Sequence, residues 1–222
     1  KGVGFFLGGA LLALIGFSGA VLAMAAVLAL IWLGSLMLLK KDLGKARAKP
    51  KFRELLSKSR AINILSAARL FLFGARDVWF VVALPVYLST VFGWDFWMVG
   101  GFLAAWVIGY GIVQSFAPRI TGKQRGQVPD GRAAFVWAAL LAGLPALIAL
   151  GLGTGWSAQL VLLGGLLLFG ALFAVNSSLH SYLIVSYAKE DGVSLDVGFH
   201  YMSNALGRLI GTLLSGWVFQ AH

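Results

Sequence analysis

The stretch LFGARDVWFVV, residues 72–82, places two charged side chains, Arg76 and Asp77, next to each other in an otherwise apolar run. An ionisable group inside a membrane-spanning helix costs about 2.5–3.5 kcal/mol on insertion scales, so such groups are retained where they pair or face a polar cavity. Arginine suits the binding of carboxylates and phosphates, because its planar guanidinium donates two parallel hydrogen bonds. The pair therefore indicates either an anion-binding site or a structural ion pair that locks two helices.

A second set of polar residues lies in the last apolar segment. Tyr201 and Asn204 precede Arg208 by seven and four residues, a spacing that places all three on one helix face. At a rise of about 1.5 Å per residue, Arg76 and Arg208 both lie near the middle of the bilayer. Because adjacent residues do not share a helix face, we expect Asp77 to pair with Arg208 on another helix and not with Arg76.

These residues predict an anion-binding site inside the helical bundle. We expect the substrate to be bound by Arg76, Arg208, Asn204, Tyr201 and Asn176, with Asp77 acting in gating or in proton coupling. The arginines Arg69, Arg76 and Arg208 outnumber the single carboxylate of Asp77, so we expect one arginine to stay unpaired until an anion arrives. The chain has no cysteine and only scattered histidines, so we predict no metal site, no cofactor and no catalytic residues.

The composition identifies the environment of this site. The chain has 222 residues, of which 59% are hydrophobic and 12% charged, and its mean hydropathy is +0.87. These values are too apolar for an ordinary soluble domain and indicate an integral membrane protein. The period-two alternation of a membrane β-barrel is absent, so we predict an all-α polytopic fold.

Seven segments have the character of membrane-spanning helices, for which about 20 apolar residues are needed. They run at about 1–17, 18–39, 62–92, 96–116, 133–152, 157–182 and 199–219. The first two are separated at the sequence GFSG, residues 16–19, because the combined block is too long for one span. The segments 18–39 and 133–152 are nearly free of polar residues, so we expect them to face lipid.

The basic residues divide the chain and orient it. They concentrate between residues 40 and 60 and between residues 119 and 132, which the positive-inside rule assigns to the cytoplasm. We therefore expect the end of an N-terminal helical bundle at 1–39, a basic cytoplasmic linker at 40–60 and a C-terminal helical bundle at 61–222. The chain begins without methionine and enters apolar sequence at once, so we expect a piece of a longer protein whose last helix is missing.

This organisation resembles the major facilitator superfamily, whose two six-helix halves move about a site at the membrane midplane. In that register the chain corresponds to the fifth to eleventh helices, and the two polar-free segments correspond to the sixth and ninth, which pack on the outside. Three stretches resemble ArsJ-type organoarsenical efflux permeases: LFGARDVWFVVALPVYL (72–88), GGFLAAWVIGYGIVQSFAP (100–118) and VGFHYMSNALGRLIGTLLSG (197–216).

The resemblance implies a multi-pass transporter of the bacterial inner (plasma) membrane that confers arsenate resistance, and not an enzyme. Its substrate would be 1-arseno-3-phosphoglycerate, which a glyceraldehyde-3-phosphate dehydrogenase forms when arsenate replaces phosphate. That dehydrogenase is therefore an expected functional partner. The resemblance assigns no binding residues.

Two alternatives remain from the sequence. The first is a facilitator-family exporter of another organic anion or of a drug. The second is an intramembrane protease, because GFSG (16–19) and HYMSN (200–204) match the serine and histidine motifs of rhomboid proteases. The order of those motifs along the chain is reversed, and the topology places them at opposite membrane faces, which disfavours the protease.

Overall fold

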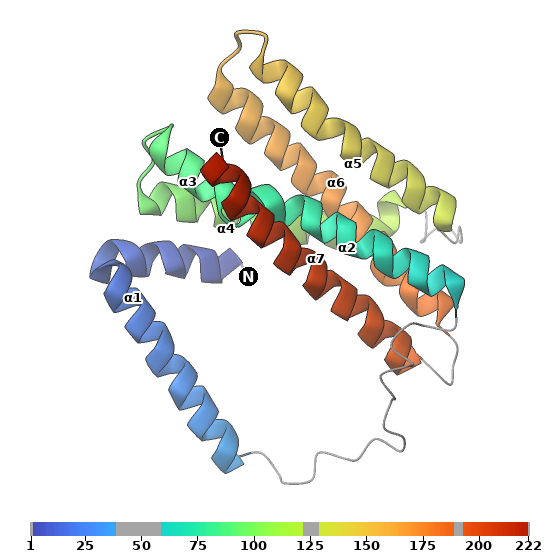
Figure 1. Cartoon of the computed structure of the whole chain (residues 1–222), viewed down its shortest axis with the longest axis horizontal. Coiled ribbons are helices and arrows are strands. Elements are labelled where there is room, and N and C mark those ends of the chain that lie inside the picture. The colour runs from blue at the N-terminus through green and yellow to red at the C-terminus, as the bar shows by residue number, and fades with distance from the viewer. Residues whose placement is uncertain (1, 39–58, 122–128, 189–192, 222) are drawn as a thin grey trace.

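The computed structural model describes residues 2–38, 59–121, 129–188 and 193–221. Every regular element in these ranges is an α-helix (Figure 1), as the sequence predicts. The helices are α1 (Gly2–Leu38), α2 (Arg60–Phe80), α3 (Ala83–Thr90), α4 (Phe96–Ile120), α5 (Gly131–Leu152), α6 (Ala158–Tyr187) and α7 (Val193–Ala221). Most of the expected linker at 40–60 lies outside the described residues.

Five described segments are long and apolar enough to cross a membrane: Phe6–Leu38, Arg60–Thr90, Phe96–Ile120, Gly131–Leu152 and Ala158–Tyr187. The expected count of about seven spans is therefore not confirmed. The last expected span does form a helix, α7, but the polar residues that it carries keep it out of this set.

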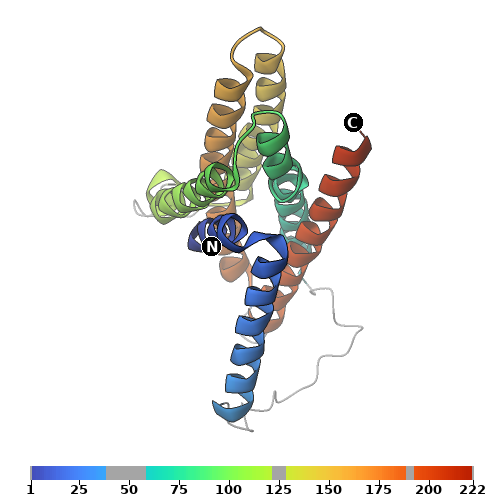
Figure 2. The same ribbon diagram turned by 90° about the vertical axis from the view of Figure 1, so that its left-hand side faces the viewer.

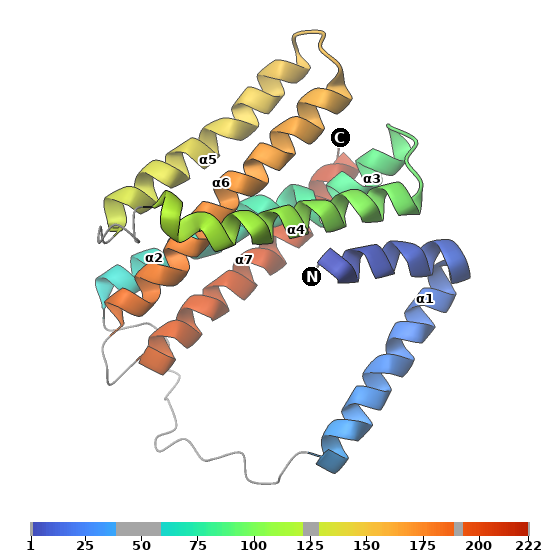
Figure 3. The ribbon, with the colours of Figure 1, turned by 180° about the vertical axis from the view of Figure 1, so that it is seen from behind.

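The expected break at residues 16–19 is confirmed. Gly16 has φ 68° and ψ 179°, a backbone conformation that glycine adopts without the steric penalty of a Cβ atom. Two helical arms of α1 meet there at an angle, and the first arm lies against α4 (Figures 2 and 3).

The segment expected as one span at 62–92 is interrupted, which the sequence reading missed. The chain makes a turn at residues 81–82, between α2 and α3. Pro85 has no N–H to donate to the carbonyl of Val81 four residues earlier, which weakens the helix at this point. The amide of Ala83 donates instead to Ser215 Oγ of α7, over 3.1 Å.

The two helices that carry the charged residues, α2 and α7, pack along most of their lengths (Figure 1). Glycines make this approach possible, as the GxxxG spacing of Gly207 and Gly211 predicts. A methyl group at Gly207 would overlap the carbonyl of Leu70, and one at Gly211 would lie 2.6 Å from the carbonyl oxygen of Gly74. A side chain at either glycine would therefore push α7 away from α2.

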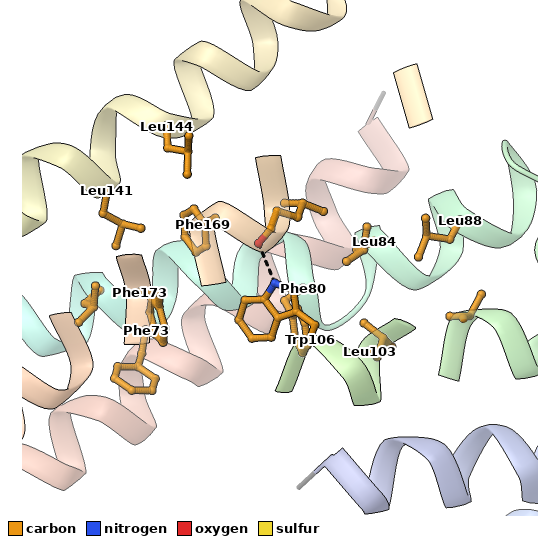
Figure 4. Close-up of a cluster of buried hydrophobic side chains, with 13 residues drawn as sticks. Phe73, Phe80, Leu84, Leu88, Leu103, Trp106, Leu141, Leu144, Phe169 and Phe173 are labelled. Atoms are coloured by element: carbon orange, nitrogen blue, oxygen red, sulfur yellow. Dashed lines mark hydrogen bonds between the residues drawn. The ribbon is translucent and has the colours of Figure 1, made fainter. Parts of the chain in front are cut away.

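Aromatic and leucine side chains fill the space between α2, α4 and α6 (Figure 4). Trp106 of α4 is 2% exposed, and its Nε1 donates a hydrogen bond of 2.8 Å to the carbonyl of Leu166 on α6. Gly170 gives the indole room, since a Cβ there would lie 2.9 Å from Trp106 Cε2. This cluster joins α4 and α6 to α2.

The two segments predicted to face lipid are the least covered. In the apolar membrane stretches, 6% of the residues of α1 and 11% of those of α5 are buried, against 33% for α6. Among the described helices α5 contacts only α6, at the edge of the bundle (Figure 3). These faces are apolar and open, which is the arrangement expected where lipid is the solvent.

We predict that Gly207→Ala separates α2 from α7 and strongly lowers thermal stability, because the added methyl meets backbone atoms that cannot move independently. The matched control is Gly216→Ala on the same helix, where a Cβ would meet nothing within 4 Å. Melting of the detergent-solubilised protein measures both. Equal melting temperatures for the two variants would contradict the close approach.

Candidate functional site

The carboxylate of Asp77 lies at the contact between α2 and α7, and its side chain is only 1% exposed. Its two oxygens bind different arginines. Arg76 Nε donates to Oδ1 over 2.6 Å, and Arg208 Nε donates to Oδ2 over 2.9 Å. The predicted pairing of Asp77 with Arg208 is thus confirmed. Arg76 lies near the middle of the candidate span Arg60–Thr90, and Arg208 lies near the middle of α7.

Two parts of the charge prediction are wrong. Arg76 does pair with its neighbour Asp77, because the long arginine side chain curves around the helix between the two positions. Arg76 and Arg208 therefore share one carboxylate, and neither of them is the arginine expected to stay unpaired. Among the described residues that role belongs to Arg69, which forms no salt bridge with a carboxylate.

Phenylalanine rings surround the guanidinium of Arg76. Its Cζ lies 5.0 Å from the ring centroid of Phe73, 5.1 Å from that of Phe173 and 5.9 Å from that of Phe80. Cation–π attraction within about 6 Å adds to the ion pair in holding the group in place. The side chain of Arg76 is 12% exposed and that of Arg208 is 48% exposed, so Arg76 is the fixed member of the pair and Arg208 the accessible one.

A cavity of about 460 Å³ opens beside this ion pair. It is lined by Arg69, Phe73, Arg76, Phe80, Val81, Trp106, Val107, Tyr110, Gln114, Ser177, Ser181, Tyr201, Asn204 and Arg208. The lining comes from α2, α4, α6 and α7 together. Four of the predicted binding residues, Arg76, Arg208, Asn204 and Tyr201, are brought together there.

The fifth predicted binding residue, Asn176, is not in the lining. It is fully buried, and its Nδ2 donates to the carbonyls of Trp137 (2.9 Å) and Leu172 (3.0 Å). These bonds direct its amide group to α5 and along α6. In this conformation Asn176 holds α5 against α6.

Several lining residues were not assigned from the sequence, although regular spacing marks them. On α2 the cavity is lined at positions 69, 73, 76 and 80, one face of a helix. Trp106, Tyr110 and Gln114 repeat at four-residue intervals on α4, and Ser177 and Ser181 do so on α6. A search for polar and aromatic side chains on one face would have found these three stripes.

Two buried histidines also meet, one from α6 and one from α7. The ring centroids of His180 and His200 lie 6.4 Å apart. His180 is 4% exposed and His200 is 1% exposed. His200 Nδ1 and Ser66 Oγ of α2 are 3.4 Å apart and share a hydrogen bond. This polar cluster joins three helices, which no spacing along the chain indicates.

The sequence family described as Major Facilitator Superfamily matches residues 2–212. The chain belongs to the major facilitator superfamily. The family and the apolar helices together identify a multi-pass membrane protein. Members of this superfamily are generally transporters of small molecules rather than enzymes, so the chain belongs to a transporter. No curated protein and no solved structure matches the chain.

The protease alternative loses its geometric basis in this facilitator. Ser18 is exposed on α1, whereas His200 is buried on α7. Among the described helices α1 contacts α4 and makes no contact with α7. The serine and histidine therefore do not form a catalytic pair.

We predict that Asp77→Asn lowers the stability of the facilitator far more than Arg208→Gln. Asp77→Asn leaves the buried Arg76 without a carboxylate, and breaking a buried pair in this way costs about 3–5 kcal/mol. Arg208→Gln leaves Asp77 bound to Arg76 and removes only a half-exposed cation. Thermal melting and abundance in the membrane measure the difference.

Arg119→Gln at the exposed end of α4 serves as the control for loss of an arginine. The opposite result has a clear meaning. If Arg208→Gln is scarcely present, and Asp77→Asn in the same chain restores abundance and transport, the charges are an interhelical lock and the anion binds elsewhere.

Proposed function

We propose that this facilitator transports an organic anion, which binds beside Arg76 and Arg208 in the cavity. The observation that carries the proposal is the balance of charge around this cavity. Three arginines line the cavity, namely Arg69, Arg76 and Arg208. Among the described residues only one carboxylate, that of Asp77, is bonded to any of them. Such an excess of positive charge around a cavity favours an anionic ligand.

The size of the cavity and its mixed lining fit a small organic molecule. Ligand sites usually enclose about 300–1,000 Å³ and combine apolar walls with a few polar groups. Here Phe73, Phe80 and Trp106 supply apolar walls, while Tyr201 and Asn204 add hydrogen-bonding groups near Arg208. An anion with hydroxyl groups would use all of these.

In this proposal Asp77 acts as a gate. Its carboxylate binds the guanidinium of Arg208, and an arriving anion competes for the same group. Because Arg208 is 48% exposed and Arg76 is enclosed by aromatic rings, the anion displaces Asp77 from Arg208 first. The ion pair between Asp77 of α2 and Arg208 of α7 then forms or breaks according to whether substrate is bound. Such a switch suits a transporter that alternates between two states.

The specific substrate that we propose is 1-arseno-3-phosphoglycerate, exported across a bacterial inner membrane to give arsenate resistance. Support comes from the three stretches that resemble organoarsenical efflux permeases, which include Arg76, Asp77 and Arg208. The proposed functional partner is the glyceraldehyde-3-phosphate dehydrogenase that makes this compound. Efflux of another organic anion or of a drug through the same cavity is the alternative.

We predict that Arg208→Lys and Arg208→Gln in the full-length protein both reduce substrate efflux from everted vesicles at least tenfold. Lysine keeps the charge but loses the two parallel hydrogen bonds of the guanidinium, which are worth about 1.5–3 kcal/mol when a charged group is involved. Cells that depend on the variant should lose resistance to arsenate, while their sensitivity to arsenite is unchanged.

The control is again Arg119→Gln, which removes an exposed arginine outside the cavity. Unchanged efflux of an organic anion by Arg208→Gln protein would contradict the anion site. Loss of efflux for an organic phosphate without arsenic, but no change in arsenate resistance, would keep the anion site and exclude the organoarsenical substrate.

A further inference from the structure

The third arginine of the cavity, Arg69, has no assigned role and is almost fully buried, with 4% of its surface exposed. Its Nη1 donates to the carbonyl of Ser177 over 2.9 Å and approaches Ser181 Oγ at 3.4 Å. Its Nε has no hydrogen-bond partner among the described residues. Unlike Arg76, it forms no salt bridge with a carboxylate of the described residues.

This arrangement leaves both a charge and a donor unsatisfied. Neutral partners such as Ser177 and Ser181 satisfy hydrogen bonds but do not cancel the charge of a guanidinium. A buried cation without a counter-charge is costly, and buried N–H groups are rarely left without an acceptor. An anionic oxygen against Arg69 would supply both the missing acceptor and the counter-charge.

The position of Arg69 relates it directly to the first anion site. The ring of Phe73 lies 4.4 Å from Arg69 Cζ and 5.0 Å from Arg76 Cζ, so the two guanidinium carbons are no more than about 9.4 Å apart. Both line the same cavity. One small molecule in this cavity can therefore contact both groups.

We propose that Arg69 binds a second anionic group of the substrate and so determines the substrate class. The class consists of organic anions with two separate negative groups, one for Arg69 and one for the site at Arg76 and Arg208. This inference rests on the proposed anion site at Arg76 and Arg208, which would bind the first group. It does not depend on arsenic being present.

The test compares two probes that share a three-carbon chain and a phosphate. 3-Phosphoglycerate carries a carboxylate at its other end, and glycerol 3-phosphate carries a hydroxyl there. Their affinities are measured on the purified full-length protein in lipid nanodiscs. We expect the wild-type protein to bind 3-phosphoglycerate about tenfold or more tightly, because one charge-assisted hydrogen bond separates the probes.

Replacement of Arg69 should remove this preference. In Arg69→Gln the affinity for 3-phosphoglycerate falls to that for glycerol 3-phosphate. Arg69→Lys keeps a cation in a poorer geometry, so the preference falls to an intermediate value. The matched control is Arg60→Gln at the exposed start of the same helix, where the preference is unchanged.

The outcomes separate this inference from the proposed function. If the wild-type protein binds both probes with equal affinity, the role of Arg69 is contradicted, and this result does not require any variant to fold. An unchanged preference in Arg69→Lys also contradicts it. Glycerol 3-phosphate binding that is lost in Arg208→Gln leaves the first anion site standing in either case. If neither probe binds the wild-type protein, the proposed function itself is contradicted.

Discussion

The buried carboxylate of Asp77 is the constraint on which the arrangement of this bundle depends. A charged carboxylate that is fully buried in a membrane segment needs compensating positive charge. Arg76 comes from its own helix, but Arg208 has to be brought from α7. Gly211 allows this, because a Cβ there would lie 3.1 Å from Asp77 Cβ as well as against the backbone of α2. The ion pair and the glycine that allows the close approach thus lie at the same contact between α2 and α7.

Much of the fold follows from physical chemistry that acts locally along the sequence. The helices, the break at Gly16 and the open faces of α1 and α5 follow from hydropathy and glycine content, since in lipid each backbone segment must satisfy its own hydrogen bonds. The pairing of Asp77 with Arg208 was also predictable, because a carboxylate within a span needs a partner. The interruption between α2 and α3 was missed, although Pro85 indicates it.

The parts that were not predictable depend on how side chains bend and which helix lies opposite. Helical spacing places Arg76 and Asp77 on different faces, yet a long side chain crosses that angle. The buried amide of Asn176 suggested a ligand site, but its two hydrogen bonds to backbone carbonyls depend on the position of α5. The meeting of His180 and His200 likewise requires the neighbours of α6 and α7 to be known. Periodicity identifies a face of a helix but not its neighbour.

The asymmetry of the shared carboxylate suggests which helix responds to substrate. Arg76 is enclosed by three phenylalanine rings and holds Asp77 from within α2, so this half of the ion pair persists when an anion enters. Arg208 is half exposed, and in the described part of the chain its guanidinium bonds to α2 only at Asp77 Oδ2. An anion that takes over Arg208 removes an electrostatic link without creating an unpaired buried charge. The change on binding is therefore expected at the contact of α7 with α2, while the aromatic cluster between α2, α4 and α6 stays intact.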